Sequence, residues 1–315
     1  MPERPLKIFV ANPRGFCAGV VRAVDALWDY HRQNQSDKPD AKTYSYHQII
    51  HNTHIVRQFE QAGVVFVNDI AEIPEGSNLM LSAHGVTPEV IKQAEQRGLR
   101  LKDATCPLVD KTHREARRYL DEGMTVLLIG HPGHDETVGT LGYAPEVKLI
   151  EKPEDVDNLQ VPDPDKVALI MQTTLSMDDA DAARKAVIGR FPNVVMPKVS
   201  DICYATQNRQ DGVKTMVDKG AEIVVVVGSQ NSSNSKRLAE VAMTAGVVRS
   251  YLIDDASELN PDWFVGAEAV GLTSGASAPE DKFQEVMAWF QQLGSTSVEE
   301  VTVADESRMS FSPPK

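Results

Sequence analysis

The sequence is poor in cysteine, in positive charge and in long apolar runs. Three cysteines among 315 residues are too few, and odd in number, for a secreted disulfide scaffold, and none lies in a CxxC pair. A formal net charge of −13 argues against a basic face for nucleic-acid binding. No apolar run reaches the roughly 18 residues of a membrane span. We therefore expect neither nucleic acid nor a membrane among the partners.

Targeting and nucleotide motifs are also missing. Only the five residues MPERP precede the first predicted strand, which leaves no room for a signal or transit peptide, so a cytoplasmic location is expected. The sequence contains no GxxxxGKS/T loop, and no GxGxxG turn follows a strand. A nucleotide cofactor is therefore not expected.

Short β-branched runs recur along the chain, each bounded by glycine, proline or asparagine. They predict strands near 6–11, 43–49, 64–68, 79–83, 99–104, 124–130, 146–151, 167–172, 194–199, 222–228, 249–253 and 268–273. Many are continuously apolar, which is typical of strands buried on both faces of a parallel sheet. Helical periodicity fills the intervals, so the predicted fold class is α/β with right-handed crossovers.

The twelve predicted strands divide into three sets of four, and a cysteine follows the first strand of each set. These are Cys17, Cys106 and Cys203, at spacings of 89 and 97 residues, and a helical segment follows each one. The pattern predicts three related α/β modules, at residues 1–98, 99–193 and 194–295, with a tail at 296–315.

Polar residues gather where the second and fourth strand of each set end. The segments are HNTH (51–54), GHPGHDET (130–137), GSQNSSNS (228–235), SAHGV (82–86), QTTLS (172–176) and TSGASAP (273–279). In open α/β sheets, ligands bind beyond the carboxyl ends of the strands. We therefore expect the three modules to point their polar ends at one central cavity.

Three equivalently placed thiols are typical of a metal site. Buried structural thiols are the plain alternative, and a catalytic thiol would require one cysteine to differ from the others. Zinc could be bound by the three cysteines with His84 or His134, but structural zinc sites usually use CxxC pairs. A cubane iron–sulfur cluster on three cysteines leaves one iron open, and the spacing favours this over zinc.

The polar clusters also contain candidate binding and catalytic groups. Imidazole, hydroxyl and amide donors can bind a phosphate without fixed positive charge. The candidates are His51, His84, His134, Thr173, Ser232, Asn234 and Ser277. Glu136, beside His134, is placed to deliver a proton to a leaving group, with Asp135 as its local competitor.

Nine motifs in order resemble the LytB family of 4-hydroxy-3-methylbut-2-enyl diphosphate reductases. They are ANPRGFCAGVVRA, IIHN, SAHGV, DATCPLV, IGHPGHDETVGT, QTTLS, DICYATQNRQ, VGSQNSSNSKRLAE and TSGASAP. The resemblance runs from about residue 9 to 295, and the tail carries none of it. Where other members have GHPEVEG, this chain has GHDETVG, so Asp135 replaces a proline next to Glu136.

The resemblance implies a cofactor and a reaction. The cofactor is one [4Fe–4S] cluster per chain on Cys17, Cys106 and Cys203, with one open iron, at the centre of three modules around a pseudo-threefold axis. The reaction takes an allylic alcohol diphosphate, two electrons and two protons. It releases water and gives isopentenyl and dimethylallyl diphosphates, as the last step of the methylerythritol phosphate route to isoprenoids.

The resemblance also implies roles for individual residues. Glu136 is the proton-relay carboxylate, and Thr173 is the partner of the substrate hydroxyl, with Thr174 beside it. The implied diphosphate-binding residues are His51, His84, His134, Ser232, Ser233, Asn234 and Ser277. Ferredoxin or flavodoxin would suit as the electron donor.

The sequence itself offers one candidate docking face for that donor, the basic segment REARR (114–118) with Lys111 just before it. The alternative is that this arginine-rich helix face is only solvated surface, as such faces usually are. The chain is expected to be a monomer.

Two other function classes remain open from the sequence. One is a zinc-stabilised module that binds a phosphorylated ligand without catalysis. The other is an iron–sulfur redox sensor, although the sequence shows neither a helix-turn-helix signal nor a basic segment as its output. After anaerobic purification, brown protein with about four irons would support the enzyme or the sensor, and colourless protein with one zinc would support the binding module.

Overall fold

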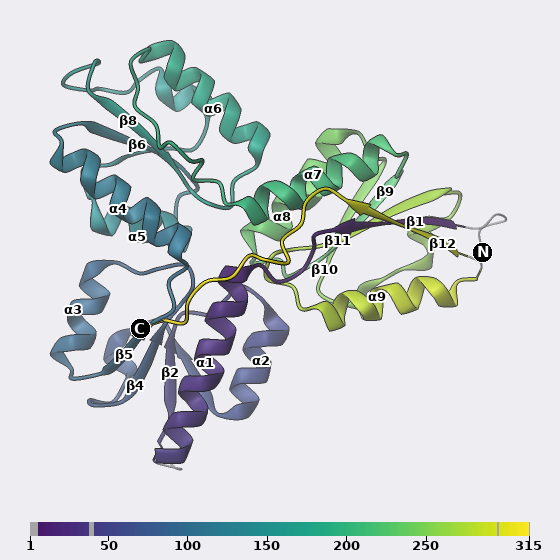
Figure 1. The fold of residues 1–315 in the computed structure, drawn as a ribbon, viewed down its shortest axis with the longest axis horizontal. Coiled ribbons are helices and arrows are strands. Elements are labelled where there is room, and N and C mark those ends of the chain that lie inside the picture. Colours follow the sequence, from purple (N-terminus) through teal and green to yellow (C-terminus); the bar gives the residue numbers. More distant parts are fainter. Residues whose placement is uncertain (1–5, 38–40, 295, 315) are drawn as a thin grey trace. The chain divides into compact units, whose positions relative to one another are not determined.

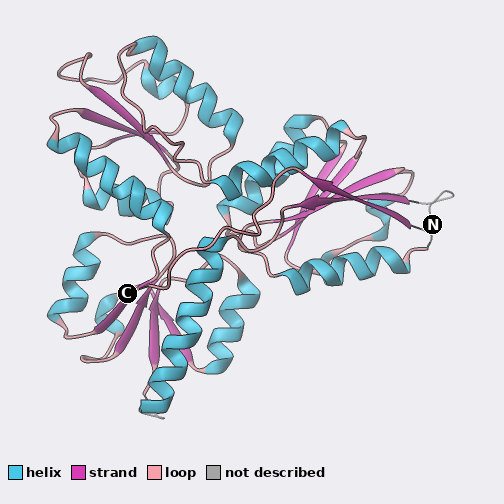
Figure 2. Cartoon of the chain, viewed as in Figure 1, coloured by secondary structure: helices cyan, strands magenta, loops and turns pink. Residues whose placement is uncertain are grey.

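The computed structural model describes residues 6–37, 41–294 and 296–314, and these contain three wholly parallel sheets (Figures 1 and 2). Sheet A has the order β10 (Arg249–Ile253), β9 (Ile223–Val227), β11 (Ala269–Ser274), β1 (Leu6–Asn12), β12 (Thr296–Thr302). Sheet B has the order β3 (Val64–Val67), β2 (Thr43–Tyr46), β4 (Asn78–Leu81), β5 (Arg100–Asp103). Sheet C has the order β7 (Lys148–Ile150), β6 (Thr125–Ile129), β8 (Val167–Met171). The predicted α/β class is therefore confirmed.

Helices connect these strands. They are α1 (Ala18–Asp37), α2 (Thr53–Ala62), α3 (Pro88–Gln96), α4 (Pro107–Asp121), α5 (Asp135–Tyr143), α6 (Met177–Arg190), α7 (Tyr204–Asp218), α8 (Ser233–Ala245) and α9 (Glu280–Gln292). Short 3-10 helices are η1 (Ile70–Glu72), η2 (Pro153–Val156), η3 (Ala256–Glu258) and η4 (Pro261–Phe264). Among the described residues, no helix combines the length and the apolar character needed to cross a lipid bilayer.

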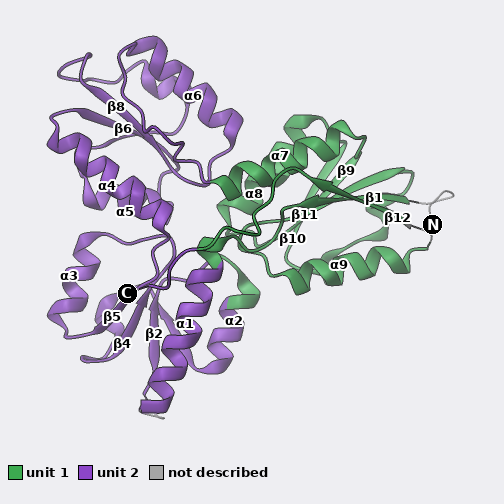
Figure 3. Cartoon of the chain, viewed as in Figure 1, with its two compact units in different colours: residues 1–20, 51–55, 204–310 green, residues 21–50, 56–203, 311–315 purple. Residues whose placement is uncertain are grey.

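The chain separates into two compact units (Figure 3). Unit 1 contains the described residues up to Val20, His51–Ile55 and Tyr204–Ser310, and therefore sheet A. Unit 2 contains Val21–Ile50, Val56–Cys203 and the described residues from Phe311 onward, and therefore sheets B and C.

The central strand of sheet A shows why its sequence is continuously apolar. Every residue of β9, IVVVV, is buried. Ile223, Val225 and Val227 pack on one face in a cluster that includes Phe283 and Phe290 of α9. Val224 and Val226 pack on the other face, in a cluster with residues of α7 and α8. A strand covered by helices on both faces has no position for an alternating polar residue.

The strand preceding each cysteine belongs to a different sheet from the one its predicted module implies. β1, predicted with the strands of residues 1–98, pairs instead with β11 and β12 of sheet A. β5 pairs with β4, although the predicted boundary at 98/99 separates the two. Val195, beyond the predicted boundary at 193/194, bridges to Ala168 of β8. Each of these segments therefore pairs with a strand outside its own predicted module, which corrects the predicted grouping.

With that correction, the three sheets share one strand order. In sheet B, β2 lies between β3 and β4, and β5 lies beyond β4. In sheet A, β9 lies between β10 and β11, and β1 lies beyond β11. In sheet C, β6 lies between β7 and β8, and the segment at Val195, which bridges to β8, takes the fourth place. In each sheet, successive strands are added in opposite directions on the two sides of one neighbouring pair, which is β2 and β4, β6 and β8, or β9 and β11. Ligands of such sheets bind at this reversal, beyond the carboxyl ends of the strands.

Two segments differ from the predicted strands. Residues 194–199 form only the isolated bridge at Val195, because Pro197, two residues on, has no amide hydrogen to continue a ladder. β12, which lies in the predicted tail, was not predicted. It pairs along its full length with β1 at the edge of sheet A.

Candidate functional site

Each cysteine stands immediately before a helix. Cys17 precedes Ala18 of α1, Cys106 precedes Pro107 of α4, and Cys203 precedes Tyr204 of α7. All three are partly buried, and none forms a disulfide. The amide groups at a helix N-terminus favour a negatively charged ligand nearby. The placement of the thiols is therefore the same in all three segments, as the sequence predicts.

The backbone amide of each cysteine donates a hydrogen bond to the segment that follows a strand at which the strand order of a sheet reverses. The Cys17 amide donates to the Ala276 carbonyl at 3.1 Å, after β11. The Cys106 amide donates to the Ala83 carbonyl at 2.9 Å, after β4, and the Cys203 amide donates to the Thr173 carbonyl at 3.0 Å, after β8. These carbonyls belong to the polar segments TSGASAP, SAHGV and QTTLS. The same contact therefore connects each cysteine with one predicted binding segment.

Glu136 and Thr173 form a buried pair in unit 2. Glu136 lies in the first turn of α5, and Thr173 lies two residues beyond β8. The Thr173 amide donates to Glu136 Oε2 at 2.9 Å, and the Thr173 hydroxyl lies 3.0 Å and 2.9 Å from the two carboxyl oxygens. Glu136 is 6% exposed and Thr173 is 5% exposed. Because the Thr173 carbonyl accepts from the Cys203 amide, the carboxyl group is two hydrogen bonds from the backbone of a cysteine.

Burial raises the pKa of Glu136 to about 7. The two hydrogen bonds from Thr173 lower it, and the nearby charge of Asp135 raises it further. Desolvation is the largest of these effects, since burial penalises the charged form. A large fraction of Glu136 therefore carries a proton at neutral pH. A carboxyl group whose pKa lies near the working pH is suited to general acid catalysis.

Asp135 faces different groups from Glu136. Its Oδ1 lies 3.3 Å from Nδ1 of His47, and its Oδ2 lies 4.0 Å from Nδ1 of His84. Its side chain is 22% exposed. The register of the turn that begins α5 thus directs the two neighbouring carboxyl groups apart, and Glu136 is the one held against Thr173.

His134 has a defined tautomer. It is the N-cap of α5, and its Nδ1 accepts the Glu136 amide at 3.2 Å. Burial lowers its pKa, so the ring is neutral at pH 7 and its proton is on Nε2. The ring of His84 lies edge-on to it, with the centroids 6.3 Å apart. An imidazole that accepts through Nδ1 can donate a hydrogen bond through Nε2.

Unit 1 holds three of the predicted polar residues together after β9 and β11. Ser232 is the N-cap of α8, and its hydroxyl lies 3.2 Å from that of Ser277. The Ser277 hydroxyl also donates to the His51 carbonyl at 3.1 Å. Asn234 Oδ1 accepts the Ala276 amide at 2.8 Å. Ser232, Asn234 and Ser277 are each less than 9% exposed, and their arrangement at a helix N-terminus suits an anion.

Ala276 connects these polar side chains with Cys17. Its amide donates to Asn234, and its carbonyl accepts from the Cys17 amide. Gly275, next to it, approaches Ser235 so closely that a Cβ there would lie 2.1 Å from the Ser235 hydroxyl. The segment after β11 is therefore tightly packed between α8 and the Cys17 backbone.

The remaining predicted residues occupy the same segments. Ser233 is the first residue of α8. Thr174 follows Thr173, and its hydroxyl accepts from Gln172 Nε2 at 2.8 Å. His51 belongs to unit 1, whereas His84 and His134 belong to unit 2.

Sequence reasoning missed Gln172. Its Oε1 accepts the His131 amide at 2.9 Å and lies 3.3 Å from the Thr137 hydroxyl, while its Nε2 donates to Thr174. It therefore fixes the loop that carries His134 and Glu136 to the end of β8. The available signal was its place in QTTLS directly after a buried strand.

The predicted docking face on α4 carries balanced charge. Arg114 pairs with Asp110 at 3.0 Å, and Arg118 pairs with Glu122 at 3.9 Å. These residues, with Arg117, line a surface cavity of about 430 Å³ that also includes His113 and Tyr143. An electron-donor site on this face stays a prediction.

Comparison with known proteins identifies the family. Residues 8–291 match the family model described as LytB protein. The chain belongs to the LytB family. The 4-hydroxy-3-methylbut-2-enyl diphosphate reductase of Acidothermus cellulolyticus is 46% identical over 100% of this chain and 91% of that protein. The enzyme of the same name from Leifsonia xyli is 47% identical over 98% of the chain and 90% of that protein.

Solved structures show the same relationship. The E-1-hydroxy-2-methyl-but-2-enyl-4-diphosphate reductase of Plasmodium falciparum matches with a TM-score of 0.93 and 31% identity, over 99% of this chain and 96% of that one. A second structure, of an (E)-4-hydroxy-3-methyl-but-2-enyl diphosphate reductase, matches with a TM-score of 0.61 and 29% identity. It covers 91% of this chain and 99% of that one. The predicted LytB membership is confirmed, and β12 and the tail lie beyond the matched LytB model.

Proposed function

We propose that this protein is an iron–sulfur reductase. It converts 4-hydroxy-3-methylbut-2-enyl diphosphate to isopentenyl and dimethylallyl diphosphates, as the last step of the methylerythritol phosphate pathway. Membership of the LytB family and the names of relatives of nearly equal length support this assignment. The observation that carries it is the shared placement of three cysteines, each directly before a helix and each with its backbone amide donating to a polar segment that follows a strand.

The donor set fits a [4Fe–4S] cluster held by Cys17, Cys106 and Cys203. The chain has no fourth cysteine, so three thiolates leave one iron without a protein thiolate. The helix that begins after each cysteine offsets part of the negative charge that the cluster brings. When bound, the cluster supplies electrons and an open iron that can bind the substrate hydroxyl. Ferredoxin or flavodoxin is the proposed source of the two electrons.

The polar side chains of the chain hold the substrate and handle its proton. Donors on His134, Ser232, Asn234 and Ser277, with His51, His84 and Ser233, bind the diphosphate. Glu136 delivers a proton to the leaving hydroxyl, so that water departs, and Thr173 orients the carboxyl group. Overall, two electrons and two protons enter, the carbon–oxygen bond breaks, and one water leaves. Thr174 stands beside this pair, held by Gln172.

Metal analysis of anaerobically purified protein tests the assignment. We expect brown protein with about four irons and about four sulfides per chain, as a cubane cluster requires. Colourless protein with one zinc would instead favour the binding module. Iron without conversion of the diphosphate would favour the redox sensor.

The diphosphate site is tested by His134→Asn. Asparagine retains an N-cap acceptor for the Glu136 amide but removes the imidazole donor. Loss of one charge-assisted hydrogen bond should weaken substrate binding about 10- to 150-fold while iron content is unchanged. Calorimetric titration of the oxidised protein measures this, with His54→Asn, whose ring pairs with Asp255, as the matched control. Equal affinity in both variants would remove His134 from the site.

A further inference from the structure

A basic residue lies about one and a half turns into the helix that follows each cysteine. Arg22 of α1 is five residues beyond Cys17, and Lys111 of α4 is five residues beyond Cys106. Arg209 of α7 is six residues beyond Cys203. In sequence these look like ordinary helix charges. In the structure each one contacts the segment that leads into a different cysteine.

Arg22 holds the segment before Cys106. Its Nη1 donates to the carbonyls of Ala104 at 3.1 Å and Thr105 at 3.0 Å, which are the two residues before that cysteine. Its Nε donates to the Ser312 carbonyl at 2.7 Å. All these groups belong to unit 2. A cationic donor shared by two successive carbonyls fixes the orientation of both peptide groups.

Lys111 holds the segment before Cys203. Its Nζ donates to the Val199 carbonyl at 3.2 Å and to Asp201 Oδ1 at 2.7 Å. Asp201 lies two residues before the cysteine and is only 5% exposed. Its Oδ2 accepts the amide of Met171, the last residue of β8, at 3.0 Å. The segment is thus bound both to α4 and to the end of sheet C.

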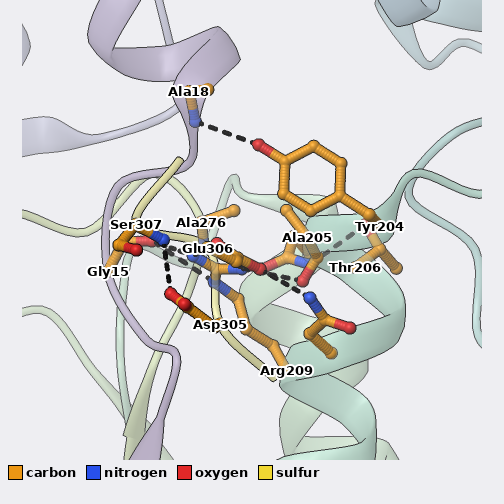
Figure 4. Close-up of polar contacts among 12 residues, drawn as sticks. Gly15, Ala18, Tyr204, Ala205, Thr206, Arg209, Ala276, Asp305, Glu306 and Ser307 are labelled. Carbon is orange, nitrogen blue, oxygen red and sulfur yellow. Dashed lines mark hydrogen bonds and ion pairs between the residues drawn. The ribbon is translucent and has the colours of Figure 1, made fainter. Parts of the chain in front are cut away.

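Arg209 holds the segment before Cys17 (Figure 4). Its Nη2 and Nε donate to the carbonyl of Gly15, two residues before the cysteine, at 2.7 Å and 3.3 Å. Its Nη1 donates to the Ala205 carbonyl at 2.9 Å and lies 3.1 Å from Glu306 Oε1. The Arg209 side chain is fully buried. All these groups belong to unit 1.

The three contacts form a closed cycle. The helix after Cys17 holds the segment before Cys106, the helix after Cys106 holds the segment before Cys203, and the helix after Cys203 holds the segment before Cys17. In each case the contact includes the residue two positions before the cysteine, namely Gly15, Ala104 and Asp201.

The three contacts do not have the same net charge. Lys111 and Arg209 are paired with Asp201 and Glu306, whereas the bonds described for Arg22 go to carbonyl groups. The common feature is the fixation of the chain that leads into the next cysteine. Groups that orient a ligand from outside its coordination sphere commonly decide how well the ligand is placed.

We propose that Arg22, Lys111 and Arg209 are positioning residues, each of which places the cysteine of the next segment in the cycle. The claim that these residues place cluster ligands rests on the proposed function. The contacts are present whether or not the chain holds a cluster. The C-terminal tail contributes to two of these contacts, because Ser312 contacts Arg22 and Glu306 contacts Arg209. Ser312 and Glu306 both lie beyond the range matched by the LytB model.

Amide hydrogen exchange of the full chain as purified tests the cycle. The probes are the Cys17, Cys106 and Cys203 amides, all of which are hydrogen-bonded, resolved by fragmentation in a mass spectrometer. The variants are Arg22→Gln, Lys111→Gln, and Arg209→Gln combined with Glu306→Gln, because Glu306 is the ion-pair partner of Arg209. Their conservative counterparts, which keep a cationic donor and should restore most of the protection, are Arg22→Lys, Lys111→Arg and Arg209→Lys.

The proposal predicts which cysteine responds. Arg22→Gln should speed exchange at Cys106 about tenfold, and much less at Cys17, which is close to it in sequence. Lys111→Gln should act on Cys203, and the Arg209 variant on Cys17. A response largest at the cysteine of the variant's own helix, or equal at all three, would overturn the proposal. If a glutamine variant does not fold, its conservative counterpart is measured against wild type, and the small loss of protection expected there must still be largest at the predicted cysteine.

Iron content separates this proposal from the proposed function. Variants that shift exchange at the predicted cysteine should also lose iron faster on exposure to a chelator. If the purified chain carries no iron–sulfur cluster, the proposed function fails, while the exchange pattern still decides whether the cycle exists.

Discussion

Replacing Glu136 by glutamine is expected to slow the single-turnover rate of the pre-reduced protein by about 10²–10⁴-fold. Glutamine retains the size of the side chain and can accept from Thr173, but it has no proton to deliver to the leaving hydroxyl. Substrate affinity should change little, because the diphosphate is held by other side chains. Dithionite in excess keeps the protein reduced and supplies the two electrons, so that delivery by a protein donor does not limit the rate.

The pH dependence of the same rate should follow the protonation of Glu136. Burial raises its pKa to about 7, so the acid form is present below that pH and is lost as the pH rises through it. The wild-type rate should therefore fall above about pH 7, and the small residual rate of Glu136→Gln should not show this step. Asp135→Asn is the control, because Asp135 contacts His47 and His84 rather than Thr173. A collapse of the rate in Asp135→Asn, with Glu136→Gln near wild type, would transfer the acid role to Asp135.

The second large effect is expected from Cys17→Ser, Cys106→Ser and Cys203→Ser. Each removes one of three thiolates, and the chain has no spare cysteine to replace it. Each variant should lose reductase activity entirely and should be purified with depleted iron and sulfide. Thr105→Ser, one residue before Cys106, is the matched control, because serine retains a hydroxyl that can bind Asp103. Full activity and a full complement of iron in any one cysteine variant would show that its thiol is not a ligand.

The sequence predicts strands and helix starts well because burial leaves a local signal. Eleven of the twelve predicted strands are present among the described residues, and continuous runs such as IVVVV in β9 are buried on both faces. Pro107 begins α4 as expected of a residue suited to the first helical turn. Each cysteine stands directly before a helix, as the sequence predicts, although the strand predicted before Cys203 is reduced to one bridge.

The sequence does not predict which distant strands pair. β1 and β11 are more than 250 residues apart, and nothing in the local periodicity of either one indicates the other. The sequence does not predict β12, because its apolar residues do not alternate with polar ones. Val298 and Val301 are separated by two glutamates, and Val298 is 52% exposed whereas Val301 is buried. The contacts of Gln172, Arg22, Lys111 and Arg209 depend on the same long-range pairing. For this reason their roles emerge only from the structure.

The most direct test of the account is one turnover of the wild-type protein. The anaerobically purified chain, with dithionite in excess as the source of two electrons per substrate, is mixed with 4-hydroxy-3-methylbut-2-enyl diphosphate, and the products are separated after quenching. The account predicts isopentenyl and dimethylallyl diphosphates, with one water released and two electrons consumed per substrate. Recovery of unchanged substrate from protein that holds its full complement of iron would contradict it.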